Sequence, residues 1–146
     1  MMTGLRAGEY FSRDPEDLKD GILREDEKKK INWRPKYYSS SVRNVAVPDE
    51  FVLYDSPKKV GTCIRDVGLQ LRENITDDPT ASLHSIRHTF LTLSRLAGCD
   101  TAVITAQTGY HSKDTSRVAQ QYGQFPDEVL IREATKVWDY VYDKIL

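Results

Sequence analysis

The residues of this sequence whose types and spacing could do chemistry are its three histidines and one neighbouring arginine. His84, His88 and His111 lie in the second half of the chain, and Arg87 follows His84 by three positions. Residues three apart lie on one side of an α-helix, so an imidazole and a guanidinium could contact one object together. A guanidinium suits phosphate because its planar fork donates two parallel hydrogen bonds and stays charged at any working pH. By itself the pair could equally belong to the solvated side of a helix.

Several segments along the chain carry further polar residues in a distinctive order. They are residues 3–9 (TGLRAGE), 33–36 (WRPK), 42–48 (VRNVAVP), 83–90 (LHSIRHTF), 108–112 (TGYHS) and 121–123 (QYG). This order resembles the tyrosine recombinase (phage integrase) family. The pattern of that family is a Gly-Leu-Arg-x-x-Glu box, a lysine on a β-hairpin, a His-x-Leu-Arg-His box, a Gly-His pair and a nucleophilic tyrosine. The resemblance covers nearly the whole chain, and its hairpin segment is similar to that of archaeal integrases.

The resemblance implies that two arginines and two histidines surround the phosphate that is cut. Arg6 and Arg87 would clamp the non-bridging oxygens of this phosphate. His84 would accept or relay the proton of the nucleophile, and His111 would hydrogen-bond the phosphate. One residue separates His111 from the preceding glycine, whereas the family has the two side by side.

The resemblance also implies a nucleophile and a general acid. Tyr122 would attack the phosphorus, and Lys36 would protonate the 5′ oxygen as it leaves. Lysines 28–30 are alternatives to Lys36, whose position just before the VAVP segment favours it. Among the other tyrosines, Tyr110 lies too close to His111 to match the family pattern.

Two residues of these boxes are expected to serve the structure rather than the chemistry. We expect Glu9 to support the fold or to orient an arginine. We expect His88 to make a buried hydrogen bond.

The implied mechanism is chemically consistent and needs no cofactor. A phenol has a pKa near 10, so Tyr122 is a poor nucleophile at neutral pH unless its environment helps. Nearby guanidiniums favour the phenolate and stabilise charge on the phosphoryl oxygens. A covalent phosphotyrosine keeps the energy of the broken bond, so rejoining requires no nucleotide. The sequence shows no metal-binding carboxylate cluster and no phosphate-binding glycine loop, and we predict neither metal nor cofactor.

Composition and charge set wider limits on the function. The chain has 146 residues, of which 39% are hydrophobic, and this predicts one domain over residues 1–146. No apolar run is long enough for a membrane span, and the first ten residues lack the apolar core of a secretion signal. Cys63 and Cys99 show neither metal-ligand nor disulfide spacing, which indicates a reduced, cytoplasmic setting. The resemblance further implies that the protein is associated with DNA. The net charge of −1 is not typical of a nucleic-acid binder, although binding a phosphate needs only local cations.

Periodicity predicts a mainly helical α+β fold with a small antiparallel β-hairpin near the N-terminus. The hairpin strands are expected over 31–36 and 42–47. Helices are expected from 61 onward, over 82–97, over 100–108, over 114–122 and from 126 onward. Before the hairpin we expect a short helix beginning within 4–11, a loop around Pro15 and a solvated turn over 25–30.

The resemblance implies double-stranded DNA as the partner and the tyrosine-recombinase catalytic fold. It further implies a homo-oligomer, a tetramer on DNA, with the last helix as a possible interface. The family's N-terminal DNA-clamping domain is not expected within these residues. Three alternatives stay open: a non-catalytic DNA-binding or regulatory remnant of an integrase, an enzyme similar to type IB topoisomerases, and an unrelated helical domain.

Overall fold

The computed structural model describes residues 3–26, 42–54, 59–109 and 125–145. Their fold is mainly helical with one small antiparallel sheet, which confirms the predicted α+β class. The elements in chain order are α1 (Ala7–Phe11), the 3-10 turn η1 (Pro15–Asp17), β1 (Leu18–Lys19), β2 (Ile22–Glu25), β3 (Arg43–Ala46), α3 (Val60–Asn74), α4 (Leu83–Leu96), α5 (Thr101–Thr108) and α7 (Asp127–Lys144). None of the described helices is both long and apolar enough to cross a membrane.

The sheet has the order β1-β2-β3, with both pairs antiparallel. Strands β1 and β2 form a hairpin around Asp20 and Gly21, whose φ angles of 50° and 75° are both positive. Paired positive φ values are typical of the two-residue turns whose twist matches that of a hairpin. This hairpin was not predicted from the sequence. The predicted strand over 42–47 corresponds to β3, which pairs with β2, while the predicted strand over 31–36 lies outside the described residues.

The helices begin and end largely where their capping residues predict. The side chain of Asp100 accepts hydrogen bonds from the N–H groups of the first turn of α5, and α5 ends at Gly109, whose φ is 60°. Helix α4 follows Ser82 and ends just before Gly98, which also has a positive φ. Helix α7 begins directly after Pro126. The predicted helix over 114–122 lies outside the described residues.

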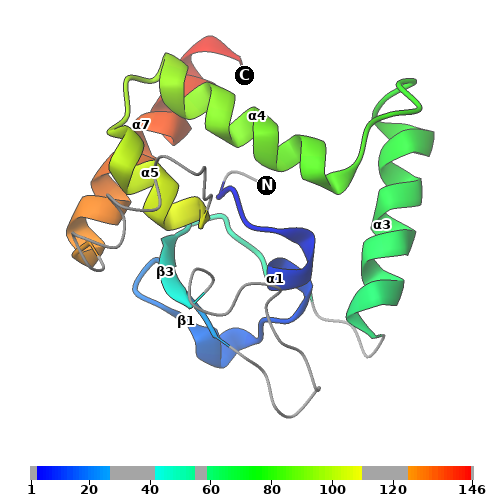
Figure 1. The fold of residues 1–146 in the computed structure, drawn as a ribbon, viewed down its shortest axis with the longest axis horizontal. Coiled ribbons are helices and arrows are strands. Elements are labelled where there is room, and N and C mark those ends of the chain that lie inside the picture. Colours follow the sequence, from blue (N-terminus) through cyan, green and yellow to red (C-terminus); the bar gives the residue numbers. More distant parts are fainter. Residues whose placement is uncertain (1–2, 27–41, 55–58, 110–124, 146) are drawn as a thin grey trace.

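Apolar side chains join these elements into a continuous arrangement. Figure 1 shows α4 running from α5 and α7 at one end to α3 at the other, with α1 between the sheet and α3. The sheet packs on α5 and α7, α1 packs on α3 and α4, and α4 packs on α5 and α7. The fold therefore brings the start of the chain, the sheet and α4 around the C-terminal end of α5.

Candidate functional site

Three arginines from distant parts of the sequence meet at the C-terminal end of α5. Each donates a hydrogen bond to a different one of three consecutive carbonyls. These bonds are Arg43 Nε to Gln107 O (2.7 Å), Arg87 Nη2 to Thr108 O (2.6 Å) and Arg6 Nη2 to Gly109 O (2.8 Å). We call Arg6, Arg43 and Arg87 the arginine cluster. The last carbonyls of a helix have no partners within the helix and carry partial negative charge, which explains why cations gather there.

Arg6 is the member of the cluster that solvent reaches. Its side chain is 28% exposed, whereas that of Arg43 is 7% exposed. Arg6 precedes α1, and Glu9 holds it in place at two points. The backbone N–H and the Nη1 group of Arg6 donate to the two carboxylate oxygens of Glu9, each at 2.7 Å.

Glu9 also pairs with Arg43 and therefore links two members of the cluster. The terminal nitrogens of Arg43 donate to the two oxygens of Glu9 at 3.0 and 2.9 Å, in the two-bonded geometry that arginine and carboxylate favour. Burial alone would raise the pKa of Glu9, but its bonds with Arg43 and Arg6 hold that pKa below the ordinary value. Glu9 thus orients arginines, as expected from the sequence.

Arg87 points inward from α4 and is only 2% exposed. Besides Thr108 O, its guanidinium donates to Gly4 O, so it joins α4 to the N-terminal segment as well as to α5. The N-terminal segment packs so closely against α4 and α5 at position 4 that only glycine fits there. The φ of Gly4 is 68°, and an added Cβ would lie 2.6 Å from a Thr108 methyl carbon and 2.7 Å from the ring of Phe90.

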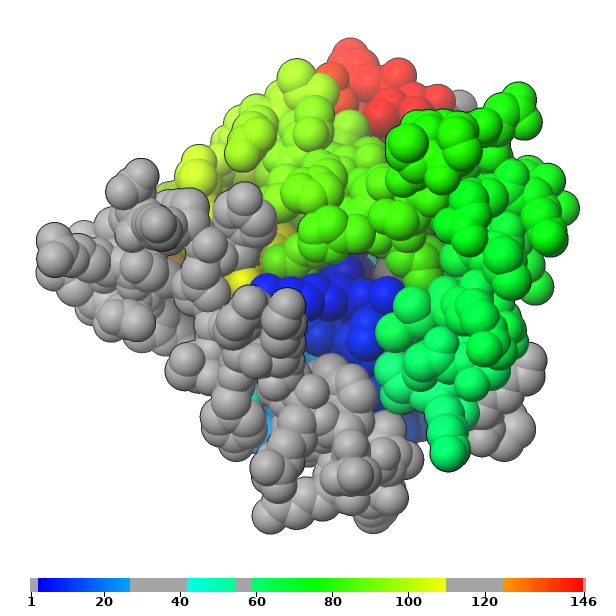
Figure 2. Space-filling model, turned by 45° about the vertical axis from the view of Figure 1, so that its right-hand side comes forward, coloured from blue at the N-terminus to red at the C-terminus, as the bar shows by residue number. Residues whose placement is uncertain are grey.

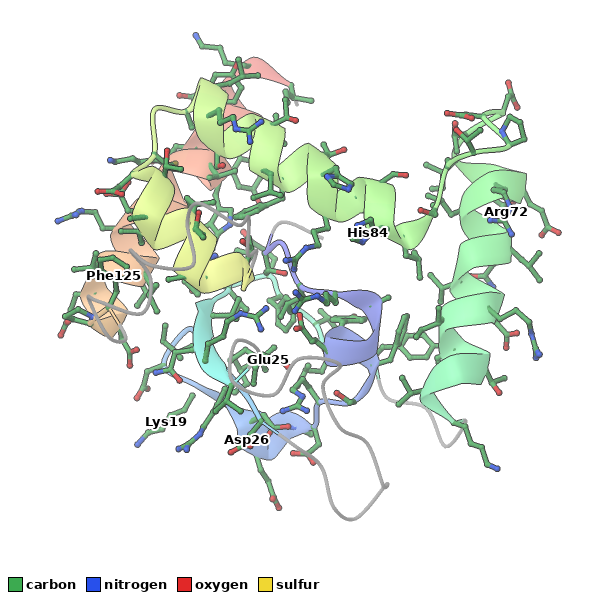
Figure 3. All side chains as sticks on the ribbon, in the orientation of Figure 1. Lys19, Glu25, Asp26, Arg72, His84 and Phe125 are labelled. Atoms are coloured by element: carbon green, nitrogen blue, oxygen red, sulfur yellow. The ribbon has the colours of Figure 1, made fainter. Side chains whose placement is uncertain are left out.

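His84 lies on the exposed side of α4, within electrostatic range of the cluster. Its ring packs edge-on against the ring of His88, with centroids 4.6 Å apart. Partial burial lowers the pKa of His84, and the charges of His88, Arg87 and Arg6 lower it further. A neutral imidazole is consequently favoured, and it can accept a proton at neutral pH. Figure 3 shows His84 on the part of α4 that lies above α1.

The surface over the N-terminal segment is recessed between two helices (Figure 2). Figure 2 shows the N-terminal residues, in dark blue, at the base of a hollow with α4 above and α3 beside it. Arg6 belongs to this segment, and its partly exposed side chain can contact an anion from solvent. Arg87 adds buried positive charge nearby, whereas the charge of Arg43 is offset by Glu9, and buried charges act more strongly than charges in water.

Of the six residues predicted for the site, the structure brings three together. Arg6 and Arg87 bond adjacent carbonyls, and both influence His84. The other three lie outside the described residues: Lys36, His111 and Tyr122. Both His111 and Tyr122 belong to the segment that follows Gly109, so the chain leaves the arginine cluster to enter that segment.

The expectation for His88 is wrong. His88 is exposed, because it stands on the solvent side of α4 one residue after the inward-pointing Arg87. It contacts His84 on one side and lines a separate hollow of about 140 Å³ that includes Cys99 and Thr101.

No known protein family, curated protein or solved structure matches the chain.

Arg43 is the member of the cluster for which no role was predicted. Its burial could have been predicted, because side chains two apart on a strand lie on the same face. Arg43 therefore shares its face with Val45 and Val47, which are both buried. An arginine at a core-facing strand position must find a buried partner, since an unpaired buried charge is very costly. Its partner, Glu9, was also visible in the sequence, although the pairing of the two was not.

A buried ionisable group lies next to the cluster, since Glu25 is the partner of Arg43 in the sheet register. Glu25, predicted to lie in a solvated turn, is 1% exposed at the end of β2. It is buried because Arg13, whose side chain is fully buried, places a positive charge 3.7 Å from Oε1. Neither carboxylate oxygen has a hydrogen-bond partner among the described residues. Burial therefore raises the pKa of Glu25 to about 8, against the opposing charge of Arg13. Figure 3 shows Glu25 toward the interior, between β3 and α1.

The chemistry that these residues can perform is binding of an anion with transfer of a proton. Guanidiniums recognise phosphate or carboxylate oxygens, and a neutral imidazole beside them can act as a general base. Within the described ranges, no three His, Cys, Asp or Glu side chains gather closely enough to hold a metal ion.

Proposed function

We propose that this chain breaks and rejoins DNA through a covalent bond between Tyr122 and a 3′ phosphate. The observation that carries the proposal is the arginine cluster with His84 beside it. Arg6 and Arg87 come from segments far apart in the sequence and meet at adjacent carbonyls of α5. The order of sequence boxes that resembles tyrosine recombinases is the second support.

Arg6 and Arg87 would have different roles, because they differ in exposure. Arg6 is the partly exposed member and would contact a non-bridging oxygen of the scissile phosphate directly. Arg87 is almost fully buried and would act mainly through its charge, unless DNA draws it away from one carbonyl. Developing negative charge on the phosphoryl oxygens would be stabilised by both.

His84 is proposed to take the proton of the attacking phenol. The low pKa of its imidazole keeps it neutral and able to accept a proton at neutral pH. Lys36 would then protonate the leaving 5′ oxygen, and His111 would bond the phosphate. Rejoining is the reverse reaction: the 5′ hydroxyl attacks phosphorus, and the phenol of Tyr122 leaves with a proton.

A second candidate function is DNA binding without cleavage. It is favoured by the deep burial of Arg87, whose terminal nitrogens already donate to Gly4 O and Thr108 O. An arginine engaged in this way supports the fold even when no phosphate is bound. A protein of this kind would retain an anion site at Arg6 and form no covalent bond.

A trapping experiment distinguishes these functions. The substrate is a pool of duplexes with a randomised centre and a nick, so that cleavage releases a short fragment and prevents rejoining. The wild type should form a protein–DNA adduct that survives denaturing gels, and sequencing of the trapped DNA would give the preferred site. Tyr122→Phe should abolish the adduct, and Tyr140→Phe, a change on α7, should not.

The other outcomes are equally informative. Binding of the pool without any adduct supports the second function and contradicts the first. Adduct formation with relaxation of supercoiled DNA, but without strand exchange between duplexes, indicates an activity similar to that of type IB topoisomerases. If the protein neither binds nor cleaves DNA, both proposals fail and the arginine cluster is structural.

A further inference from the structure

A groove on this protein lies apart from the arginine cluster and shares no residue with it. It has a volume of about 420 Å³ and lies where the β1–β2 turn and the loop after β3 meet α7. The turn and the loop are joined, because the N–H of Val47 donates to Gly21 O at 2.9 Å. One wall of the groove is therefore fixed by a backbone hydrogen bond.

The other wall is a stripe of mostly apolar side chains along α7. Ile131, Thr135, Trp138 and Tyr142 line the groove. Their spacing of three and four residues places them on one side of the helix. The stripe covers eleven steps of 1.5 Å and is therefore about 16 Å long. Tyr142 is 49% exposed, so part of an aromatic ring faces solvent.

The groove is strongly acidic. Four exposed carboxylates belong to its lining: Asp20, Asp49, Glu50 and Asp139. Among the described residues that line it, none is a lysine or an arginine. The groove consequently repels phosphate, and it attracts cations that can also stack on the aromatic rings of α7.

We propose that this groove binds an extended arginine- or lysine-rich peptide segment of a partner protein. Carboxylates on the rim would pair with the basic side chains, and the stripe on α7 would pack against their aliphatic stems. A length of about 16 Å corresponds to roughly five residues of extended chain, at 3.3 Å each. A single small cation would fill only part of that length. The proposal does not depend on the DNA chemistry of the arginine cluster.

Fluorescence polarisation with a defined probe tests the proposal. The probe is a fluorescein-labelled hexapeptide of alternating arginine and alanine, and the control peptide has glutamine in place of arginine. At 150 mM salt we expect the wild type to bind the arginine probe at least tenfold more tightly than the control. The variant D49N/E50Q/D139N should lose roughly tenfold in affinity, since it removes three exposed ion pairs that are each weak. Tyr142→Ala should weaken binding about threefold.

A matched variant separates the groove from general charge attraction. E16Q/E73Q/D77N removes the same number of exposed carboxylates outside the groove and should change the affinity less than threefold. Equal losses in both triple variants would overturn the proposal, as would a wild type that does not distinguish the two peptides. Displacement of the probe by free arginine amide at a concentration matched in arginine would mean a small-cation site, and would likewise overturn the assignment of a peptide.

Discussion

Substitution of Glu25 by glutamine should change how the stability of this protein depends on pH. The buried carboxyl has a pKa of about 8 in the folded chain against an ordinary value of 4.5. Between these two values the folded state binds a proton that the unfolded state has lost. The free energy of unfolding contributed by Glu25 is therefore highest below pH 4.5 and falls as pH rises to about 8.

The size of the effect follows from the two pKa values. Each pH unit in this interval lowers the free energy of unfolding by about 1.36 kcal/mol. The total loss between the ordinary pKa of 4.5 and the folded-state pKa of about 8 is therefore about 5 kcal/mol. Glutamine has nearly the same shape and does not titrate. Between pH 5 and pH 8, the difference in free energy of unfolding between Glu25→Gln and the wild type should thus shift by about 4 kcal/mol in favour of the variant.

Urea unfolding followed by circular dichroism at pH 5, 6, 7 and 8 measures this difference. Comparison of two chains that differ at one residue cancels the titration of all other groups. The exposed Glu16→Gln variant is the control and should follow the wild type at each pH. If the stabilities of Glu25→Gln and the wild type fall in parallel over this range, Glu25 is ionised in the folded protein and the assignment of its pKa is wrong.

Three further predictions concern the candidate site. Arg43→Met breaks the buried two-bonded pair with Glu9 and should lower the free energy of unfolding in urea by roughly 3–5 kcal/mol. Arg65→Met breaks an exposed pair and should lower it by less than about 1 kcal/mol. A cost of under 1 kcal/mol for Arg43→Met would show that the pair is not needed. Gly4→Ala should destabilise by more than about 2 kcal/mol, because a Cβ there meets packed atoms at a positive φ, and Gly61→Ala, on an open face of α3, should be neutral or stabilising. The imidazole of His84 should titrate below its ordinary pKa of 6.5 by NMR, and titration at or above 6.5 would place the arginine charges out of range.

The sequence allowed good prediction of the helical half of the fold. Asp100 before α5, Gly109 after it and Pro126 before α7 are capping residues with local effects, so their signals need no knowledge of the tertiary structure. The β1–β2 hairpin was missed because its strands are too short to show an alternating pattern. The Asp20–Gly21 dipeptide could have predicted it, since this pair favours two-residue hairpin turns.

The candidate site was predictable in its members more than in its arrangement. The order of the sequence boxes suggested that Arg6, His84 and Arg87 act together. No local pattern could show that α5 supplies the carbonyls that collect the arginines, because that depends on packing between distant segments. The burial of Glu25 escaped prediction for the same reason, because its counter-charge, Arg13, lies in the segment between α1 and η1.

The arrangement at the end of α5 has a consequence for folding. The bond from Arg6 to Gly109 closes a loop of more than a hundred residues, and the bond from Arg43 to Gln107 closes another long one. Closing such loops costs chain entropy, and this cost is offset only by the contacts of the complete tertiary structure. The arginine cluster should therefore assemble late, and a partly folded chain would contain well-formed helices without the cluster. The three arginines are in this way brought together only in the completed native state.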